Sequence, residues 1–299
     1  MVRQSSIISL AAIALLLTPS ILVSRINSSV QLLNSVRAIA AEPPSIPEPE
    51  NDPGALDRDD LDRNVLDRES ESDSVQPSDP LDSPYPVPWQ WVVDTQQEIG
   101  EPTTPQMRYY RSDALVSPDG QYAAYSRIQL HVVSEPTQNQ VSSILFLENL
   151  ETGDLQLITA SSPLGVAQFS PNPADQIPGA IAILVPVSWS ATSDRMLARE
   201  FESLFGTGLA SDYAVIWDRQ HNLTRTVAPA NIRYTNAVLI GWSQNNPGQV
   251  LFRAGNLGDE QWPLYAVDST GHAIAVANDQ PIAFGQRVTS TWSGPQAYR

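Results

Sequence analysis

Four acidic side chains of this 299-residue chain stand close enough in sequence to suggest chemistry. Glu200 and Glu202 precede an apolar stretch, which Asp212 and Asp218 flank. Two carboxylates at a suitable separation can hydrolyse a glycosidic bond or bind Ca²⁺. The alternative is that these acids form solvated turns, where acidic residues are common. Glu200, Asp212 and Asp218 are therefore candidate ligand-facing residues.

Trp262 is the fourth candidate, because it lies in a polar loop directly before Pro263. An exposed tryptophan can stack against a sugar ring. Other tryptophans fall at recurring positions, which favours a role in the core between repeats. These are Trp189, Trp217, Trp242 and Trp292.

The histidines and the cysteine count offer little further chemistry. His131, His221 and His272 are far apart, and none has a partner two or four positions away, so metal-ligand spacing is absent. A Ser-His-Asp triad can form from distant residues, but the chain has no G-x-S-x-G motif to support one. With no cysteine, it has neither thiolate ligands nor a cysteine nucleophile. We expect no metal and no cofactor, and the sequence favours a protein that is not an enzyme.

The net charge of −16 disfavours nucleic acid as a partner, because such a chain repels phosphates. Residues 42–88 hold fourteen acids, three arginines and many prolines, which predicts a disordered acidic linker. Leu-Asp-Arg recurs there with a period of five, which forms no continuous apolar face. That repeat is either part of a solvated tether or a short docking motif.

Residues 1–41 predict an export signal or a membrane anchor. Arg3 precedes an apolar run from Ile7 to Val23, and a positive start followed by a hydrophobic core is typical of export signals. The run is marginally short for a membrane-spanning helix. Ala38-Ile39-Ala40 matches a cleavage site but lies well beyond the run. Either alternative predicts an extracytoplasmic location, membrane-anchored or periplasmic.

Residues 89–299 repeat a pattern of tight turns and short strands. In the first copy, the turn Ser117-Pro118-Asp119-Gly120 precedes a strand from Tyr122 to Ser126. Proline presets φ early in such a turn, and glycine accepts the positive φ that follows. A period near 50 residues with several strands predicts β-propeller blades. The Trp-Ser pairs that mark this period begin at Trp189, Trp242 and Trp292.

This pattern resembles the repeats of TolB-like and WD40-like β-propeller proteins over about residues 109–295. The first copy carries the resemblance best, with its Ser-Pro-Asp-Gly turn and a later strand that ends before Thr152-Gly153. The resemblance implies an all-β fold, a small or incomplete β-propeller of about four blades. A β-sandwich is the alternative. We expect Trp89–Val93 to add a closing strand and Glu200–Gly206 to form a short helix.

Propeller repeats specify an architecture rather than an activity. With the N-terminal segment and the linker, they favour a non-catalytic, membrane-tethered, extracytoplasmic interaction module. Such a module would bind an envelope protein through a propeller face. The alternative is a glycan-active hydrolase or a glycan-binding domain of the cell envelope.

Overall fold

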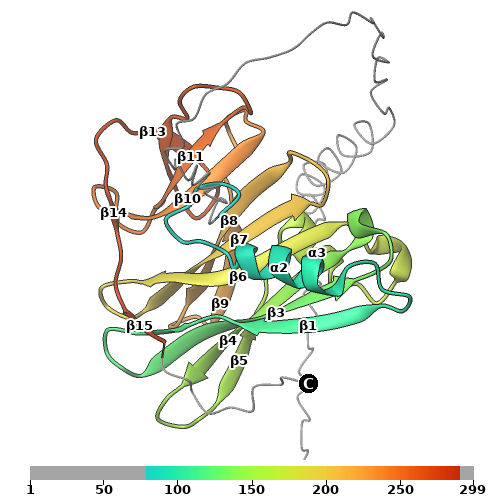
Figure 1. Ribbon diagram of the computed structural model, residues 1–299. Coiled ribbons are helices and arrows are strands. Elements are labelled where there is room, and N and C mark those ends of the chain that lie inside the picture. The colour runs from blue at the N-terminus through green and yellow to red at the C-terminus, as the bar shows by residue number, and fades with distance from the viewer. Residues whose placement is uncertain (1–78, 290–299) are drawn as a thin grey trace, which may run out of the picture. The chain divides into compact units, whose positions relative to one another are not determined.

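A computed structural model describes residues 79–289 of the chain. The predicted signal or anchor, most of the predicted linker and the repeat predicted from Trp292 lie outside these residues. The described part is all-β, which confirms the predicted class, with one sheet of ten strands and one of five (Figure 1). Its helices fall short of the length and apolar character needed to cross a bilayer.

Twelve strands form three antiparallel four-stranded meanders, which follow one another from green through yellow to orange in Figure 1. Meander 1 consists of β2 (Ala114–Val116), β3 (Tyr122–Val132), β4 (Gln140–Asn149) and β5 (Leu155–Ile158). Meander 2 consists of β6 (Ala180–Trp189), β7 (Arg195–Leu204), β8 (Ala210–Asp218) and β9 (Leu223–Val227). Meander 3 consists of β10 (Asn236–Ser243), β11 (Val250–Gly255), β12 (Leu264–Val267) and β13 (Ala273–Ala275).

Three further strands and four short helices complete the described fold. β1 (Gln106–Arg111) pairs with β3, beside β2. The remaining elements are β14 (Pro281–Ile282), β15 (Gln286–Val288), α2 (Trp89–Ile99), α3 (Pro163–Ala167) and the 3-10 helices η1 (Pro136–Gln138) and η2 (Pro173–Asp175).

The same serine-centred turn joins the first two strands of each meander. The serine hydroxyl donates to a carboxylate at 2.5 Å in the pairs Ser117–Asp119, Ser190–Asp194 and Ser243–Asp279. In meanders 1 and 2 the acid lies within the turn, whereas in meander 3 it comes from a later segment, because the turn carries Asn245-Asn246 instead. The Trp-Ser landmarks at 189 and 242 thus fall at equivalent places, the ends of β6 and β10.

Successive meanders bury the faces that they turn toward each other. We call the face toward the following meander the forward face and the face toward the preceding one the rear face. Leu147 on the forward face of meander 1 belongs to one core cluster with Met196 and Trp217 on the rear face of meander 2. Leu197 on the forward face of meander 2 shares a second cluster with Leu239 and Phe252 on the rear face of meander 3.

The segment 281–288 crosses the first strand of every meander in turn. Ile282 of β14 pairs with Trp242 of β10, and the N–H of Trp189 donates to the carbonyl of Phe284 at 3.0 Å. β15 then pairs with β2 of meander 1. This one segment therefore fastens all three meanders together.

Residues 79–99 differ from the sequence prediction. Asp79 and Val87 are 2% exposed, so the folded part already includes the last ten residues of the predicted linker. Trp89–Ile99 is a helix and not the predicted closing strand. Val92, Thr95 and Ile99 are spaced three and four apart, which places them on one helical face. Val92 packs in a third core cluster with residues of β3, β4, β6 and β7.

The predicted helix over Glu200–Gly206 is also wrong, because β7 continues to Leu204. Its side chains alternate between two faces that are both buried, Glu200 and Glu202 on one face and Phe201 on the other. A strand that is covered on both faces lacks the polar and apolar alternation by which strands are recognised in a sequence.

Candidate functional sites

The predicted ligand-facing residues do not meet at one site. Glu200 and Asp212 lie on the neighbouring strands β7 and β8 but on opposite faces, because Glu200 pairs with Tyr213 and Asp212 pairs with Phe201. Both carboxylates are fully buried, so the solvated-turn interpretation is wrong for them. Asp218 is the last residue of β8, directly before a turn, and it accepts a hydrogen bond from the N–H of His221 at 3.0 Å.

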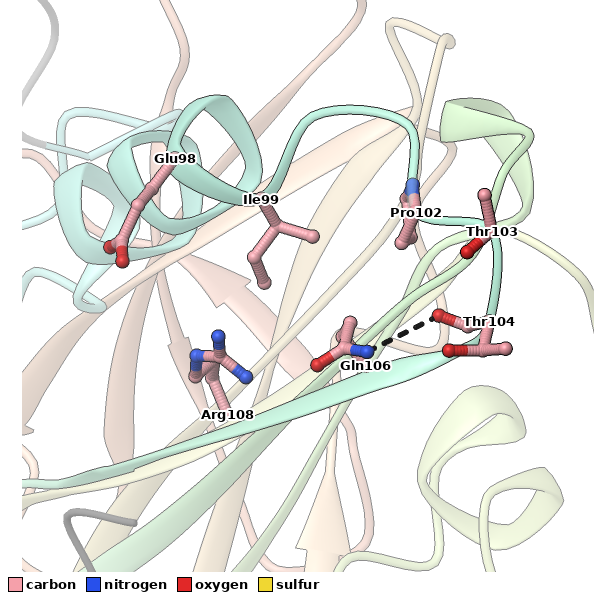
Figure 2. A pocket seen from close by; sticks show the side chains of 7 residues that line it. All are labelled: Glu98, Ile99, Pro102, Thr103, Thr104, Gln106 and Arg108. Atoms are coloured by element: carbon pink, nitrogen blue, oxygen red, sulfur yellow. Dashed lines mark hydrogen bonds between the residues drawn. The ribbon is translucent and has the colours of Figure 1, made fainter.

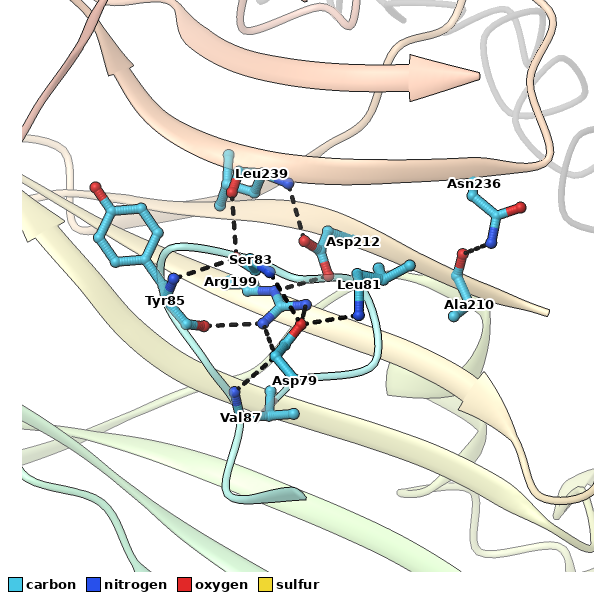
Figure 3. Close-up of polar contacts among 10 residues, drawn as sticks. All are labelled: Asp79, Leu81, Ser83, Tyr85, Val87, Arg199, Ala210, Asp212, Asn236 and Leu239. Carbon is cyan, nitrogen blue, oxygen red and sulfur yellow. Dashed lines mark hydrogen bonds and ion pairs between the residues drawn. The ribbon is translucent and has the colours of Figure 1, made fainter. Parts of the chain in front are cut away.

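Asp212 belongs to a buried ion network centred on Arg199 (Figure 3). Nη1 of Arg199 lies 2.6 Å from Oδ2 of Asp79 and donates to the carbonyl of Tyr85 at 2.8 Å. Nε of Arg199 lies 2.8 Å from Oδ1 of Asp212, and all three charged side chains are fully buried. Arg199 and Asp79 were not among the predicted site residues, although an arginine within the apolar run Met196–Phe201 is a visible signal.

This network joins three parts of the fold. Asp79 brings in the N-terminal segment, Arg199 belongs to meander 2, and Asp212 accepts a hydrogen bond from the N–H of Leu239 in meander 3 at 2.9 Å. Burial raises the pKa of Asp212 to about 6, against the opposing effects of Arg199 and the Leu239 N–H. For Asp79 burial acts in the same direction, but the hydrogen bond and charge of Arg199 outweigh it and hold the pKa below its usual value. These contacts link the N-terminal segment to meanders 2 and 3, and we call the network of Asp79, Arg199 and Asp212 the clamp.

Glu200 and Glu202 form a second buried acidic pair, on the rear face of meander 2. The N–H groups of Leu164 and Gly165, at the start of α3, donate to Oε1 of Glu202 at 2.8 and 2.7 Å. Burial raises the pKa of Glu202 to about 7. Burial, together with the charges of Glu202 and Asp212, raises the pKa of Glu200 well above its usual value. Raised carboxyl pKa values suit acid catalysis, but both of these side chains are buried in the described structure.

Trp262 borders a groove of about 980 Å³ on the forward face of meander 3. The apolar part of the groove consists of Val238, Ile240 and Leu81. The ring of Trp262 packs against Gly255, where a Cβ would lie 2.5 Å from the ring. The charged residues of the lining are Asp82, Arg253, Asp259 and Glu260.

The tryptophans do not support the sugar-platform interpretation. Trp189, Trp217 and Trp242 are buried between meanders, which confirms the predicted core role for these three. Trp262 is only half-buried, but its ring lies against the β11 backbone. A single ring held in this way gives less than the pair of coplanar aromatic rings that a sugar platform requires.

Another, smaller cavity of about 310 Å³ lies between the end of α2 and β1 (Figure 2). Glu98 and Ile99 come from the helix, and Arg108 comes from the strand beneath it. The cavity is open and mostly polar, and it includes none of the predicted ligand-facing residues.

The rear face of meander 1 carries four of the ten large apolar side chains that are exposed in the described part of the chain. Tyr125 stacks on Phe146 with ring centroids 5.5 Å apart and an interplanar angle of 12°. The guanidinium of Arg111 lies 4.0 Å from the centre of the Tyr125 ring. The strand pairing places further residues on this same face. Its large exposed apolar residues are Met107 (49%), Tyr109 (55%), Leu155 (56%) and Leu157 (57%).

Neither the described side chains nor the comparisons with known proteins indicate a further function. Between residues 79 and 289, no three His, Asp or Glu side chains are grouped so as to hold a metal ion. Comparison with protein-family models and with curated proteins finds no match to this chain. The exposed surfaces of the three meanders are therefore the remaining candidates for a functional site.

Proposed function

We propose that this chain is a non-catalytic interaction module that binds a protein partner through the rear face of meander 1. In this proposal the three meanders are blades of an incomplete β-propeller, as the likeness to TolB-like and WD40-like repeats suggests. The N-terminal segment would tether the module to a membrane and place it outside the cytoplasm. One observation carries the proposal: this rear face is open, whereas the equivalent faces of the other two meanders are covered.

The equivalence of these faces follows from a recurring backbone hydrogen bond. The N–H groups of Ser117, Ser190 and Ser243 donate to the carbonyls of Tyr122, Arg195 and Gln249 at 2.8 to 3.0 Å. Three positions beyond these acceptors stand Tyr125, Ala198 and Phe252. Ala198 and Phe252 are fully buried against the preceding meander. Tyr125 has no preceding meander in the described chain and remains half-exposed.

A repeat that cannot bury its own face depends on a neighbour to cover it. Large exposed apolar side chains that gather on one face often mark a site of association. Aromatic and arginine side chains are enriched at protein interfaces, and this face carries Tyr109, Tyr125 and Phe146 beside Arg111. These features support a protein partner over a glycan. A hydrolase is less well supported, because Glu200 and Asp212 lie on opposite faces of the sheet.

Site-specific photocrosslinking tests the proposal. A photoreactive residue replaces Leu157 on the rear face, and the matched control replaces exposed Ser269 in the turn between β12 and β13. We expect a polypeptide adduct in cells from position 157 and none from position 269. Equal yields at the two positions, or adducts with carbohydrate only, would contradict the proposal.

A further inference from the structure

We infer that the partner is a second copy of this chain, whose forward face of meander 3 covers the rear face of meander 1. This inference rests on the proposed function and names the partner of the same surface. It commits to a head-to-tail contact, in which two different surfaces meet, rather than to a pairing of like surfaces.

The forward face of meander 3 is the next in the series of faces that form the two interfaces inside the chain. Ala124, Leu197 and Leu251 are equivalent, each standing two positions beyond the carbonyl that accepts the recurring hydrogen bond. Ala124 faces meander 2, and Leu197 faces meander 3. Leu251 lies on the next face in this series, the face that carries the Trp262 groove. Leu251 is fully buried in a cluster that Leu81 and Trp262 cover. A second copy that continues the stack would therefore place its Tyr125 against these covering residues at the groove.

The charged residues of the two surfaces also differ in sign. The rear face of meander 1 carries Arg111 and the exposed Arg127 against one carboxylate, the mostly buried Glu148. The lining of the groove carries three carboxylates against one arginine. The groove residues concerned are Asp82, Asp259, Glu260 and Arg253. The two surfaces are therefore opposite in sign, which favours their association with each other over the pairing of either with itself.

The shapes of the two surfaces allow two copies to close into a ring. Leu155 and Leu157 project from the open sheet face, and the groove is a hollow whose lining includes Leu81 and Trp262 beside charged residues. Each copy has one surface of each kind, so two copies can satisfy both surfaces at once in a closed ring. Two sets of three meanders make six, within the range of about four to eight blades found in propellers.

The experiment uses two variants of the full-length chain, each altered only at exposed positions. The rear variant combines Arg127→Glu with Leu157→Glu, and the forward variant combines Glu260→Arg with Ile274→Arg. Ile274 pairs with Ala266, which places it on the forward face. Sedimentation velocity reports association. We expect the unaltered chain to dimerise and each variant alone to lose affinity at least tenfold.

Mixing the two variants is the decisive step. The rear variant retains an intact forward face, and the forward variant retains an intact rear face, so an equimolar mixture should recover dimers. A mixture that stays monomeric, or an unaltered chain that is monomeric, would overturn the inference. Leu223→Glu, at an exposed leucine of meander 2, is the matched control and should dimerise normally. If copies do not associate while position 157 still crosslinks to another polypeptide, the inference fails and the proposed function stands.

Discussion

The guanidinium of Arg199 lies 2.6 Å from the carboxylate of Asp79, a residue 120 positions earlier in the chain. This contact fixes the last ten residues of the predicted linker against the middle of the three meanders. The same carboxylate accepts hydrogen bonds from the N–H groups of Leu81, Ser83 and Val87, so it also sets the conformation of its own segment. The start of the folded part thus depends on one buried charge.

Replacing Asp79 with alanine should destabilise the fold strongly. The change leaves Asp212 as the one charged partner of Arg199 and removes the acceptor for three backbone N–H groups. Removing one partner of a buried ion pair costs about 3–5 kcal/mol. Urea denaturation measures the free energy of unfolding. Asp82→Asn, at an exposed neighbour, is the control and should stay within about 0.5 kcal/mol of the unaltered chain. Similar values for the two variants would contradict the clamp.

The raised pKa of Glu202 predicts a pH dependence of stability that Glu202→Gln removes. Because burial raises this pKa to about 7 in the folded chain, the folded state holds a proton that the unfolded state has lost above its ordinary pKa. The stabilising contribution is complete below the ordinary pKa and is lost as the pH rises through about 7. The unaltered chain should therefore lose about 2–3 kcal/mol more than the variant between pH 5 and pH 8.

Urea denaturation at the two pH values gives the comparison. The glutamine retains an oxygen that can accept from Leu164 and Gly165, so the helix α3 should keep its anchor. Glu98→Gln changes an exposed carboxylate and should leave the pH dependence intact. An identical pH dependence in the unaltered chain and in Glu202→Gln would show that Glu202 titrates normally.

A comparison of Gly285 with Gly258 separates the cost of backbone strain from the cost of a steric clash. Gly285 lies in the segment that crosses the meanders, and Gly258 lies in the loop after β11. Gly285 has φ +103°, and a Cβ there would lie 2.8 Å from both the Val116 carbonyl oxygen and the Trp189 ring. Gly258 has a similar φ of +96°, but its Cβ would meet nothing within 4 Å. Alanine should cost about 1–3 kcal/mol at either position through φ. At Gly285 the clash should add about 1–3 kcal/mol. Equal costs in thermal or urea unfolding would mean that the crossing is loosely packed.

Much of the repeat architecture follows from the sequence. The Ser-Pro-Asp-Gly turn and the Trp-Ser pairs at 189 and 242 mark equivalent places, because each serine closes the same turn with local hydrogen bonds. The all-β class and the burial of Trp189, Trp217 and Trp242 follow from the same pattern. Turns that are closed by local hydrogen bonds can be recognised in a single sequence.

What could not be predicted depends on contacts between distant residues. The sequence of β7 resembles that of a helix because both faces of the strand are buried. The sequence places Asp79 in the linker because its partner Arg199 is 120 positions away. In the sequence, Glu200 and Asp212 are typical of exposed acids. The register of β7 and β8 is needed to place them on opposite buried faces. No local pattern marks a carboxylate that will be covered by another meander.

We propose that a polypeptide covers the rear face of meander 1 when the protein performs its function, and a single thiol placed on that face tests this directly. The chain has no cysteine, so Leu157→Cys provides a single reporter thiol, and Ser269→Cys provides its matched control. The measurement is the rate at which a membrane-permeant maleimide labels each thiol, in intact cells and in dilute purified protein. We predict that the thiol at 157 is labelled at least tenfold more slowly than the thiol at 269 in cells, and at a similar rate after purification and dilution. Equal labelling of the two thiols in both settings would contradict the claim.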